Sequence, residues 1–158
     1  MRNSLLALLP LAATLASTTA CQKSAGSEND FENGPATVRG EWRLAVVGGG
    51  ITGVMTPVPA SSDNRCVFGP DSTYTEYVNG KRTLTSTFYI ANRPAYAGGP
   101  AVPMLAIKSD NSPSGQPYYR VQYITELTAS KLALTTGGGC ALNSEYVRTK
   151  AAGPATTP

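Results

Sequence analysis

The stretch TYTEYVNGKRTLTSTFYI, residues 73–90, decides the fold. Its first part is rich in threonine, tyrosine and valine, which favour strands. It then reaches Asn79-Gly80, the strongest short-range signal for a two-residue hairpin turn. On the return, Leu84, Phe88 and Ile90 fall on one face and hydroxyl-bearing residues fall on the other. This period of two predicts a pair of antiparallel strands with one apolar face.

The segments on either side of this hairpin repeat the same pattern. Short β-rich runs are separated by Gly/Pro loops, and no useful length of the chain has a helical period. The runs beyond the hairpin are residues 65–68, 102–108, 118–127, 131–136 and 145–148. With the strand at Trp42, the count is about eight strands with short connections. Such a layout is typical of an all-β sandwich or a closed antiparallel barrel.

Composition excludes several classes of function. The chain has 158 residues with 13 Lys+Arg and 10 Asp+Glu, so its net charge of +3 is too mild for an electrostatic nucleic-acid binder. It has no histidine, which excludes a Ser-His-Asp triad and every histidine-containing metal site. Three cysteines are too few for a cysteine-only zinc or iron–sulfur site. The carboxylates occur singly along the chain, so we expect no catalytic residues, with convergence of two distant carboxylates in the fold as the alternative. We also expect no cofactor and no metal.

The first 20 residues have the layout of an export signal. Arg2 precedes an apolar run at residues 5–13, and small residues continue to Ala20. A transmembrane anchor needs about 20 apolar residues, and this run is too short. We therefore expect residues 1–20 to be removed.

The next residues determine how the protein is held in the cell envelope. Thr18-Thr19-Ala20-Cys21 resembles a bacterial lipobox, which implies that Cys21 is lipidated and anchors the chain to a membrane surface. Gln22 follows where an Asp would favour inner-membrane retention, so the resemblance implies the outer membrane, on either side of it. Residues 21–39 are polar and predict a flexible tether, and residues 151–158 predict a disordered tail. A soluble secreted protein remains the alternative.

The cysteine count predicts a disulfide. Setting Cys21 aside leaves Cys66 and Cys140, an even pair in an oxidising compartment. The alternative is two buried free thiols.

One segment matches the sequence pattern of a dinucleotide-binding motif, but the residues that follow do not fit the structure that the motif needs. The segment WRLAVVGGGITG, residues 42–53, looks like a strand followed by G-x-G-x-x-G. That motif requires a helix whose amide groups face the pyrophosphate. Pro57 and Pro59 fall where the second turn of the helix would be, so the helix cannot form. We interpret residues 48–63 as a mobile loop.

Several pieces of the chain, in order, resemble one family. Gly40-Glu41-Trp42 resembles the G-x-W signature of lipocalins, especially the small lipocalin-like domains of Bacteroidetes lipoproteins. Residues 71–81 are similar to the central hairpin of these domains, and residues 131–140 and 146–148 to their closing strands. The resemblance covers residues 40–150 and implies an up-and-down β-barrel of about eight strands. It also implies that Trp42 closes the base of the barrel, with Arg148 stacked across its indole by a cation–π contact.

An eight-stranded barrel either fills its interior with side chains or holds one small ligand. The candidate ligand-lining residues are Phe68, Leu84, Phe88, Met104, Tyr119 and Tyr123, together with Leu105 and Val121. The candidate lid is formed by Ile51, Val54 and Met55, with Val58 beside them. The alternative is that the apolar strand faces are simply core.

Two functions from different classes stay open. The first is a lipid-anchored module that binds a small apolar or amphipathic ligand in the barrel mouth. The second is a structural or interaction lipoprotein with a solid barrel that contacts another envelope protein. A cavity of about 300 Å³ or more beside residues 48–63 would favour the first. A filled lumen with an exposed apolar or tyrosine patch would favour the second.

Overall fold

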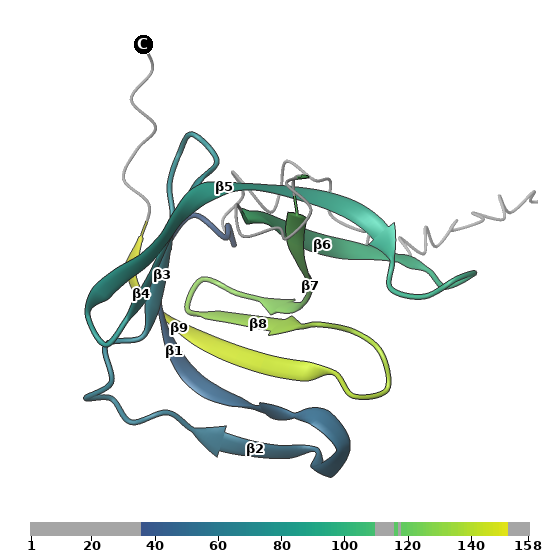
Figure 1. The fold of residues 1–158 in the computed structure, drawn as a ribbon, viewed down its shortest axis with the longest axis horizontal. Coiled ribbons are helices and arrows are strands. Elements are labelled where there is room, and N and C mark those ends of the chain that lie inside the picture. Colours follow the sequence, from purple (N-terminus) through teal and green to yellow (C-terminus); the bar gives the residue numbers. More distant parts are fainter. Residues whose placement is uncertain (1–35, 110–115, 117, 152–158) are drawn as a thin grey trace, which may run out of the picture.

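The computed structural model describes residues 36–109, 116 and 118–151, and nearly all of them are β-structure (Figure 1). One 3₁₀ turn, η1 (Gly50–Thr52), lies among the strands. The strands are β1 (Gly40–Gly49), β2 (Val54–Pro57), β3 (Arg65–Phe68), β4 (Thr73–Val78), β5 (Lys81–Pro94), β6 (Ala101–Ser109), β7 (Tyr118–Leu127), β8 (Lys131–Thr135) and β9 (Leu142–Ala151).

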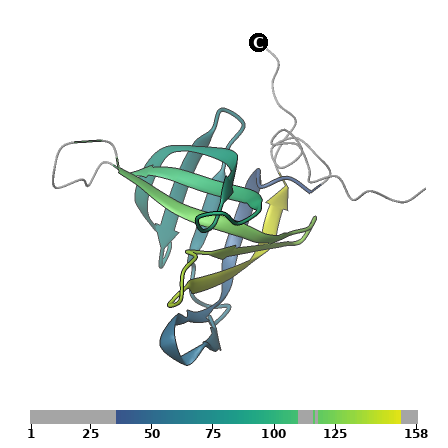
Figure 2. The same cartoon turned by 90° about the vertical axis from the view of Figure 1, so that its right-hand side faces the viewer.

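Eight of these strands form a closed antiparallel barrel. Each strand from β3 to β9 pairs with the next along the chain, and β1 pairs with both β3 and β9. The β1–β9 contact runs along the whole of β1, from Gly40 to Gly49 (Figure 2). The predicted all-β, eight-stranded, up-and-down barrel is therefore confirmed. Such a barrel is consistent with a calycin-like fold.

The hairpin that decides the fold has the expected turn. Val78 pairs directly with Lys81, so Asn79 and Gly80 are the two turn residues. Both have positive φ, 50° and 76°, as a two-residue turn of this kind requires. Gly80 also donates its backbone N–H to the carbonyl of Asp63 at 2.9 Å. The turn is thereby tied to the segment that leads into β3.

The interior of the barrel is filled with side chains. One set of alternate strand positions points inward, and these residues form a single apolar cluster. Leu84, Leu127 and Tyr146 pack against it. The buried members are Val38, Trp42, Cys66, Phe68, Tyr74, Phe88, Ile90, Leu105, Ile107, Ile124, Leu132 and Leu134. Within it, the ring of Phe68 packs against the rings of Tyr74 and Phe88, with centroids 5.2 and 5.0 Å away.

One end of the barrel is closed by the segment that precedes β1. Trp42 is fully buried and donates its indole N–H to the carbonyl of Val38 at 2.6 Å. The guanidinium of Arg148 lies 4.0 Å from the centre of the Trp42 ring. The same guanidinium donates to the carbonyls of Thr37, Arg39 and Ala129. The structure thus brings Trp42 and Arg148 together, and Arg148 ties the segment before β1 and the β7–β8 turn to the last strand.

The glycine-rich segment forms a hairpin where we expected a loop. β1 continues to Gly49, η1 turns the chain, and β2 pairs back onto β1. A Cβ at Gly48 would collide with the backbone of Val54, so only glycine permits this close return. The pairing from Val46↔Pro57 to Gly49↔Val54 corrects the prediction of a mobile loop. After Gly49 the chain makes the 3₁₀ turn η1 and enters β2, so no α-helix begins at the glycines.

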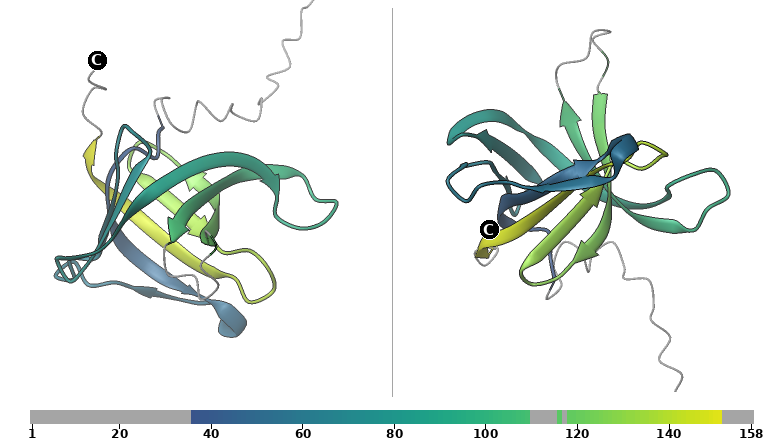
Figure 3. Two further views of the ribbon diagram at one scale, coloured as in Figure 1. Left: turned by 45° about the horizontal axis from the view of Figure 1, so that its top comes forward. Right: turned by 90° about the horizontal axis from the view of Figure 1, so that it is seen from below.

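A second hairpin also extends beyond its neighbours. β5 pairs with β4 as far as Thr87 and with β6 from Phe88 to Pro94. β6 pairs with β7 only from Met104 onward. The ends of β5 and β6 therefore project as an arm (Figure 3).

Trp42→Ala should lower the free energy of unfolding by about 3–5 kcal/mol, because it removes a fully buried ring and leaves a cavity. Trp42→Phe keeps a ring beneath Arg148 and loses the hydrogen bond to Val38, so a loss of about 1–3 kcal/mol is expected. Urea unfolding followed by circular dichroism measures both. A free energy of unfolding of Trp42→Ala close to that of the wild type would contradict this role.

Candidate functional site

The proposed ligand-lining residues lie on two different sides of the barrel wall. Phe68 and Phe88 are buried inside, and Leu84 packs against the cluster to which they belong. Met104, Tyr119 and Tyr123 point outward, because the inward residues of β6 are Leu105 and Ile107. Of the two further residues named, Leu105 is core and Val121 is on the outer side. The prediction for Met104, Tyr119 and Tyr123 is therefore wrong.

The error comes from β7, whose polar side chains face the interior and whose apolar side chains face outward. Its inward positions include Arg120 and Gln122, which pair with the core residues Ile107 and Leu105. Its outward positions are apolar and aromatic. Alternation alone would turn the aromatic face inward. Pairing with β6 fixes the opposite register, because a shift of one residue would expose the whole inner face of β6.

The inward Arg120 is neutralised by β4. Its Nη2 donates to Oε2 of Glu76 and to the hydroxyl of Tyr74, both at 2.8 Å. The Tyr74 hydroxyl also donates to Oε2 of Glu76, at 3.2 Å. We call Arg120 and Glu76 the inner charge pair. Sequence reasoning treated Glu76 as an isolated carboxylate, and only closure of the sheet brings residue 120 to it.

Burial sets the protonation of the groups around this pair. Desolvation raises the pKa of Tyr74 and of the Cys66 thiol far above their ordinary values. The pKa of Tyr146 is raised for the same reason. Burial pulls the pKa of Arg120 down, but Tyr74 and Glu76 outweigh it, and the net shift is upward. Arg120 therefore keeps its positive charge beside Glu76, among hydroxyl and thiol groups that burial keeps neutral.

The two barrel cysteines are free thiols, which corrects the predicted disulfide. Cys66 is buried and pairs with Trp42 near one end of β1. Cys140 is exposed beside Ala141, whose carbonyl accepts from Gly50 just past the other end of β1. Trp42 and Gly49 are seven residue steps apart along β1, which corresponds to about 23 Å at 3.3 Å per residue. A disulfide needs Cα atoms less than about 7 Å apart.

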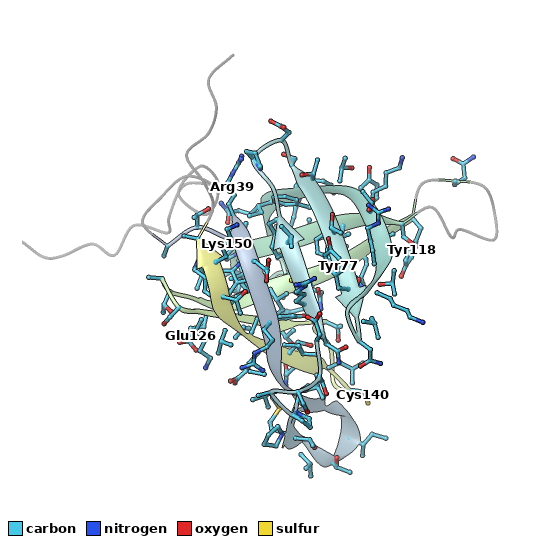
Figure 4. The ribbon with its side chains drawn as sticks, turned by 90° about the vertical axis from the view of Figure 1, so that its left-hand side faces the viewer. Arg39, Tyr77, Tyr118, Glu126, Cys140 and Lys150 are labelled. Atoms are coloured by element: carbon cyan, nitrogen blue, oxygen red, sulfur yellow. The ribbon has the colours of Figure 1, made fainter. Side chains whose placement is uncertain are left out.

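In Figure 4, Cys140 lies at the end of the molecule remote from Arg39 and Lys150.

Two of the pockets on the described residues are small. One, with a volume of about 140 Å³, lies at the mouth of the barrel and is lined by Leu84, Ile107, Lys108, Ser109, Tyr118 and Arg120. The other, of about 220 Å³, is at the opposite end and is lined by Gly40, Glu41, Val67, Phe68, Gly69, Pro70, Lys150 and Ala151. Both are smaller than the roughly 300 Å³ at which ligand pockets begin. Neither is lined by residues 48–63.

The proposed lid residues do not cover either pocket. Ile51, Val54 and Met55 lie on the β1–β2 hairpin, which projects away from the barrel at the bottom of Figure 2. Ile51 is 93% exposed and Val54 is 62% exposed. The lid interpretation is therefore not supported, and the hairpin is an apolar projection into solvent.

The outer side of β5, β6 and β7 carries an aromatic surface. Tyr89 and Tyr119 make an edge-to-face contact with centroids 5.5 Å apart, and both are exposed. On β6, which lies between the other two strands, Ala106 is 0% exposed and Met104 only 8%, although both point outward. We call this the outer tyrosine face. Its members are Tyr89, Met104, Ala106, Tyr119, Val121 and Tyr123.

Other kinds of site were sought in the same part of the chain. Within residues 36–109, 116 and 118–151, no group of three or more Cys, Asp or Glu side chains could hold a metal ion. No helix in those ranges is long and apolar enough to cross a membrane. Cys21 and the predicted signal, most of the tether and the tail lie outside the described residues.

A thiol titration tests the corrected cysteine assignment. Cys140 should react with Ellman's reagent in the native protein, whereas Cys66 should react only after unfolding, since it is buried. Cys140→Ser should abolish the native-state reaction and leave the reaction in urea. Failure of both cysteines to react in urea without reductant would mean that they are bonded to each other.

The buried acids predict a loss of stability at alkaline pH. Because the folded-state pKa values are raised, the stabilisation is complete below the ordinary pKa of the thiol, 9.0, and of the phenols, 10.0. It decreases as the pH rises above them, since the unfolded chain ionises first. The urea midpoint should fall between pH 9 and 11. The urea midpoint of Cys66→Val should fall less steeply with pH than that of the wild type. Identical slopes for the two proteins would contradict the role of the thiol.

Comparison of the chain with protein-family models, with curated proteins and with solved structures found no match. The assignment of fold therefore depends on the strand order and on the closure of β1 against β9. On that basis the chain is a closed, eight-stranded, antiparallel up-and-down barrel.

Proposed function

We propose that this chain is a lipid-anchored protein of the cell envelope whose solid barrel contacts another envelope protein through the outer tyrosine face. The anchor is proposed from the export signal and the lipobox resemblance at Cys21. The contact surface is proposed from the barrel itself. The observation that carries it is the combination of a filled interior with aromatic side chains on the outside of β5–β7.

The interior leaves little room for a ligand. The packed rings of Phe68, Tyr74 and Phe88 occupy part of it, and Trp42 is buried at its base. Typical small-molecule sites have about 300–1,000 Å³. The mouth pocket has about 140 Å³, less than half the lower limit. A function carried by the outer surface is therefore favoured over transport of a ligand inside the barrel.

The outer tyrosine face has the composition of a protein interface. Tyrosine and methionine are enriched where proteins meet, because a large ring gives contact area and the hydroxyl gives a hydrogen bond. Tyr89 and Tyr119 already hold each other in an edge-to-face contact, so little side-chain freedom is lost on binding. Met104 and Ala106 beneath them exclude water from the centre of the patch.

A second candidate function is capture of a small anion with a short apolar part at the mouth pocket. Leu84 and Ile107 give this pocket apolar walls, and Arg120 gives it a cation. The buried Nε of Arg120 has no hydrogen-bond partner among the described residues, which favours an acceptor there. Glu76 already neutralises the guanidinium, so affinity for an anion would be modest.

Adjacent residues separate the two functions. Tyr118 lines the mouth pocket, whereas Tyr119 belongs to the outer tyrosine face. A photo-crosslinking phenylalanine at position 119, in cells that make the full chain, should give a discrete adduct with one envelope protein, and one at position 118 should not. Tyr119→Ser should lower recovery of that partner about tenfold or more, because interface tyrosines are often hot spots.

Tyr118→Ser is the matched control and should leave partner recovery unchanged. Equal recovery of the partner with Tyr119→Ser, Tyr118→Ser and the wild type would contradict the proposed interface.

A further inference from the structure

We propose that the tip of the β1–β2 hairpin inserts into the surface of the lipid bilayer to which the chain is anchored. We call residues 48–57 the apolar finger. This inference rests on the proposed membrane anchorage and adds a second, independent contact with the lipid. The finger leaves the barrel at the end remote from Gly40, where the chain enters β1 (Figure 2).

The finger exposes apolar side chains that no part of the described structure covers. Ile51 at its tip is 93% exposed, Val54 is 62% exposed, and Met55 is also exposed. All four residues of β2 are exposed. An apolar projection of this kind is stabilised when it leaves water for the boundary between lipid headgroups and acyl chains.

The finger carries no charge that would oppose insertion. Residues 44–62 contain no Asp, Glu, Lys or Arg, and the first charged residues on either side are Arg43 and Asp63. Moving an ion into the hydrocarbon region costs several kcal/mol at its centre, whereas this segment carries none. In a chain with 23 charged residues out of 158, an uncharged run of this length that is also exposed points to an apolar environment.

The backbone of the finger favours lipid over an added protein strand. Val58 donates to Ala45 at 2.8 Å, so alternate residues of β2 point their backbone groups at β1. The residues that point their backbone outward are Met55 and Pro57. Proline has no N–H, so this edge has a single outward donor and is poorly suited to strand addition. Because few backbone groups of this edge are unpaired, the free-energy cost of moving it into lipid is small.

The anchor can reach the finger. Fifteen residue steps separate Cys21 from Ala36, and a chain of that length spans at most about 50 Å. β1, which separates the entry of the chain from the finger, has ten residues and a length of about 33 Å. A lipid on Cys21 and the tip at Ile51 can therefore contact the same membrane.

A tryptophan at the tip tests this directly. Trp42, the single tryptophan, is fully buried, so it gives a constant background. Ile51→Trp in the mature, lipidated chain is reconstituted into phosphatidylethanolamine/phosphatidylglycerol vesicles, with and without brominated phosphatidylcholine. We expect emission at shorter wavelength than in detergent-free buffer, and at least twofold quenching by the brominated lipid.

Tyr119→Trp, on the outer tyrosine face, is the matched control and should show neither change. Water-like, unquenched emission from Ile51→Trp on vesicles, with Cys21 acylated by mass spectrometry, overturns the finger and leaves the anchor intact. Where Cys21 carries no lipid, the same vesicles are added to the unacylated protein. Quenching there supports the finger although the anchor has failed, and its absence overturns the finger as well. In the unacylated protein, Ile51→Asp should weaken binding to vesicles at least tenfold more than Tyr119→Ser does.

Discussion

Stacking of Arg148 on Trp42 joins the first and the last strand of this barrel, β1 and β9. The two residues face each other across the β1–β9 pairing, the contact that turns an open sheet into a closed barrel. Closure removes the exposed edges that an open sheet of eight strands would present. The guanidinium also binds the carbonyls of Thr37 and Arg39, so the segment before β1 is held across the base. A single buried indole therefore organises the first strand, the last strand and the end of the lumen.

The interior that results is largely apolar, with one charged pair. Aromatic and aliphatic side chains fill most of it, and the inner charge pair of Arg120 and Glu76 lies toward the mouth. Placing Arg120 inside turns the aromatic residues of β7 outward, where they form the outer tyrosine face with β5 and β6. The polar interior position and the apolar exterior surface thus have the same origin, which is the register of β7 against β6. This register is why we propose that the protein acts through its outer surface.

The sequence predicts the hairpin at Asn79-Gly80, the strand content and the partners Trp42 and Arg148, because these depend on local turn chemistry or on a strong motif. It does not predict which face of β7 points inward, since Arg120 is tolerated inside only when Glu76 arrives from β4. The β1–β2 hairpin was missed because two prolines suggested a loop, yet Pro57 occupies the outward position of an edge strand, where no N–H is needed. The Cys66–Cys140 pairing was inferred from parity, which carries no information about distance.

The central claim is that this barrel is filled and acts through its outer surface. Native mass spectrometry of the protein released from its own envelope tests that claim most directly. The account predicts a mass equal to the processed polypeptide with its acyl chains, alone or with a second protein, and no further small molecule. A stoichiometric small-molecule adduct that survives in wild type and disappears in Arg120→Met would contradict it, because such a ligand would have to occupy the barrel mouth.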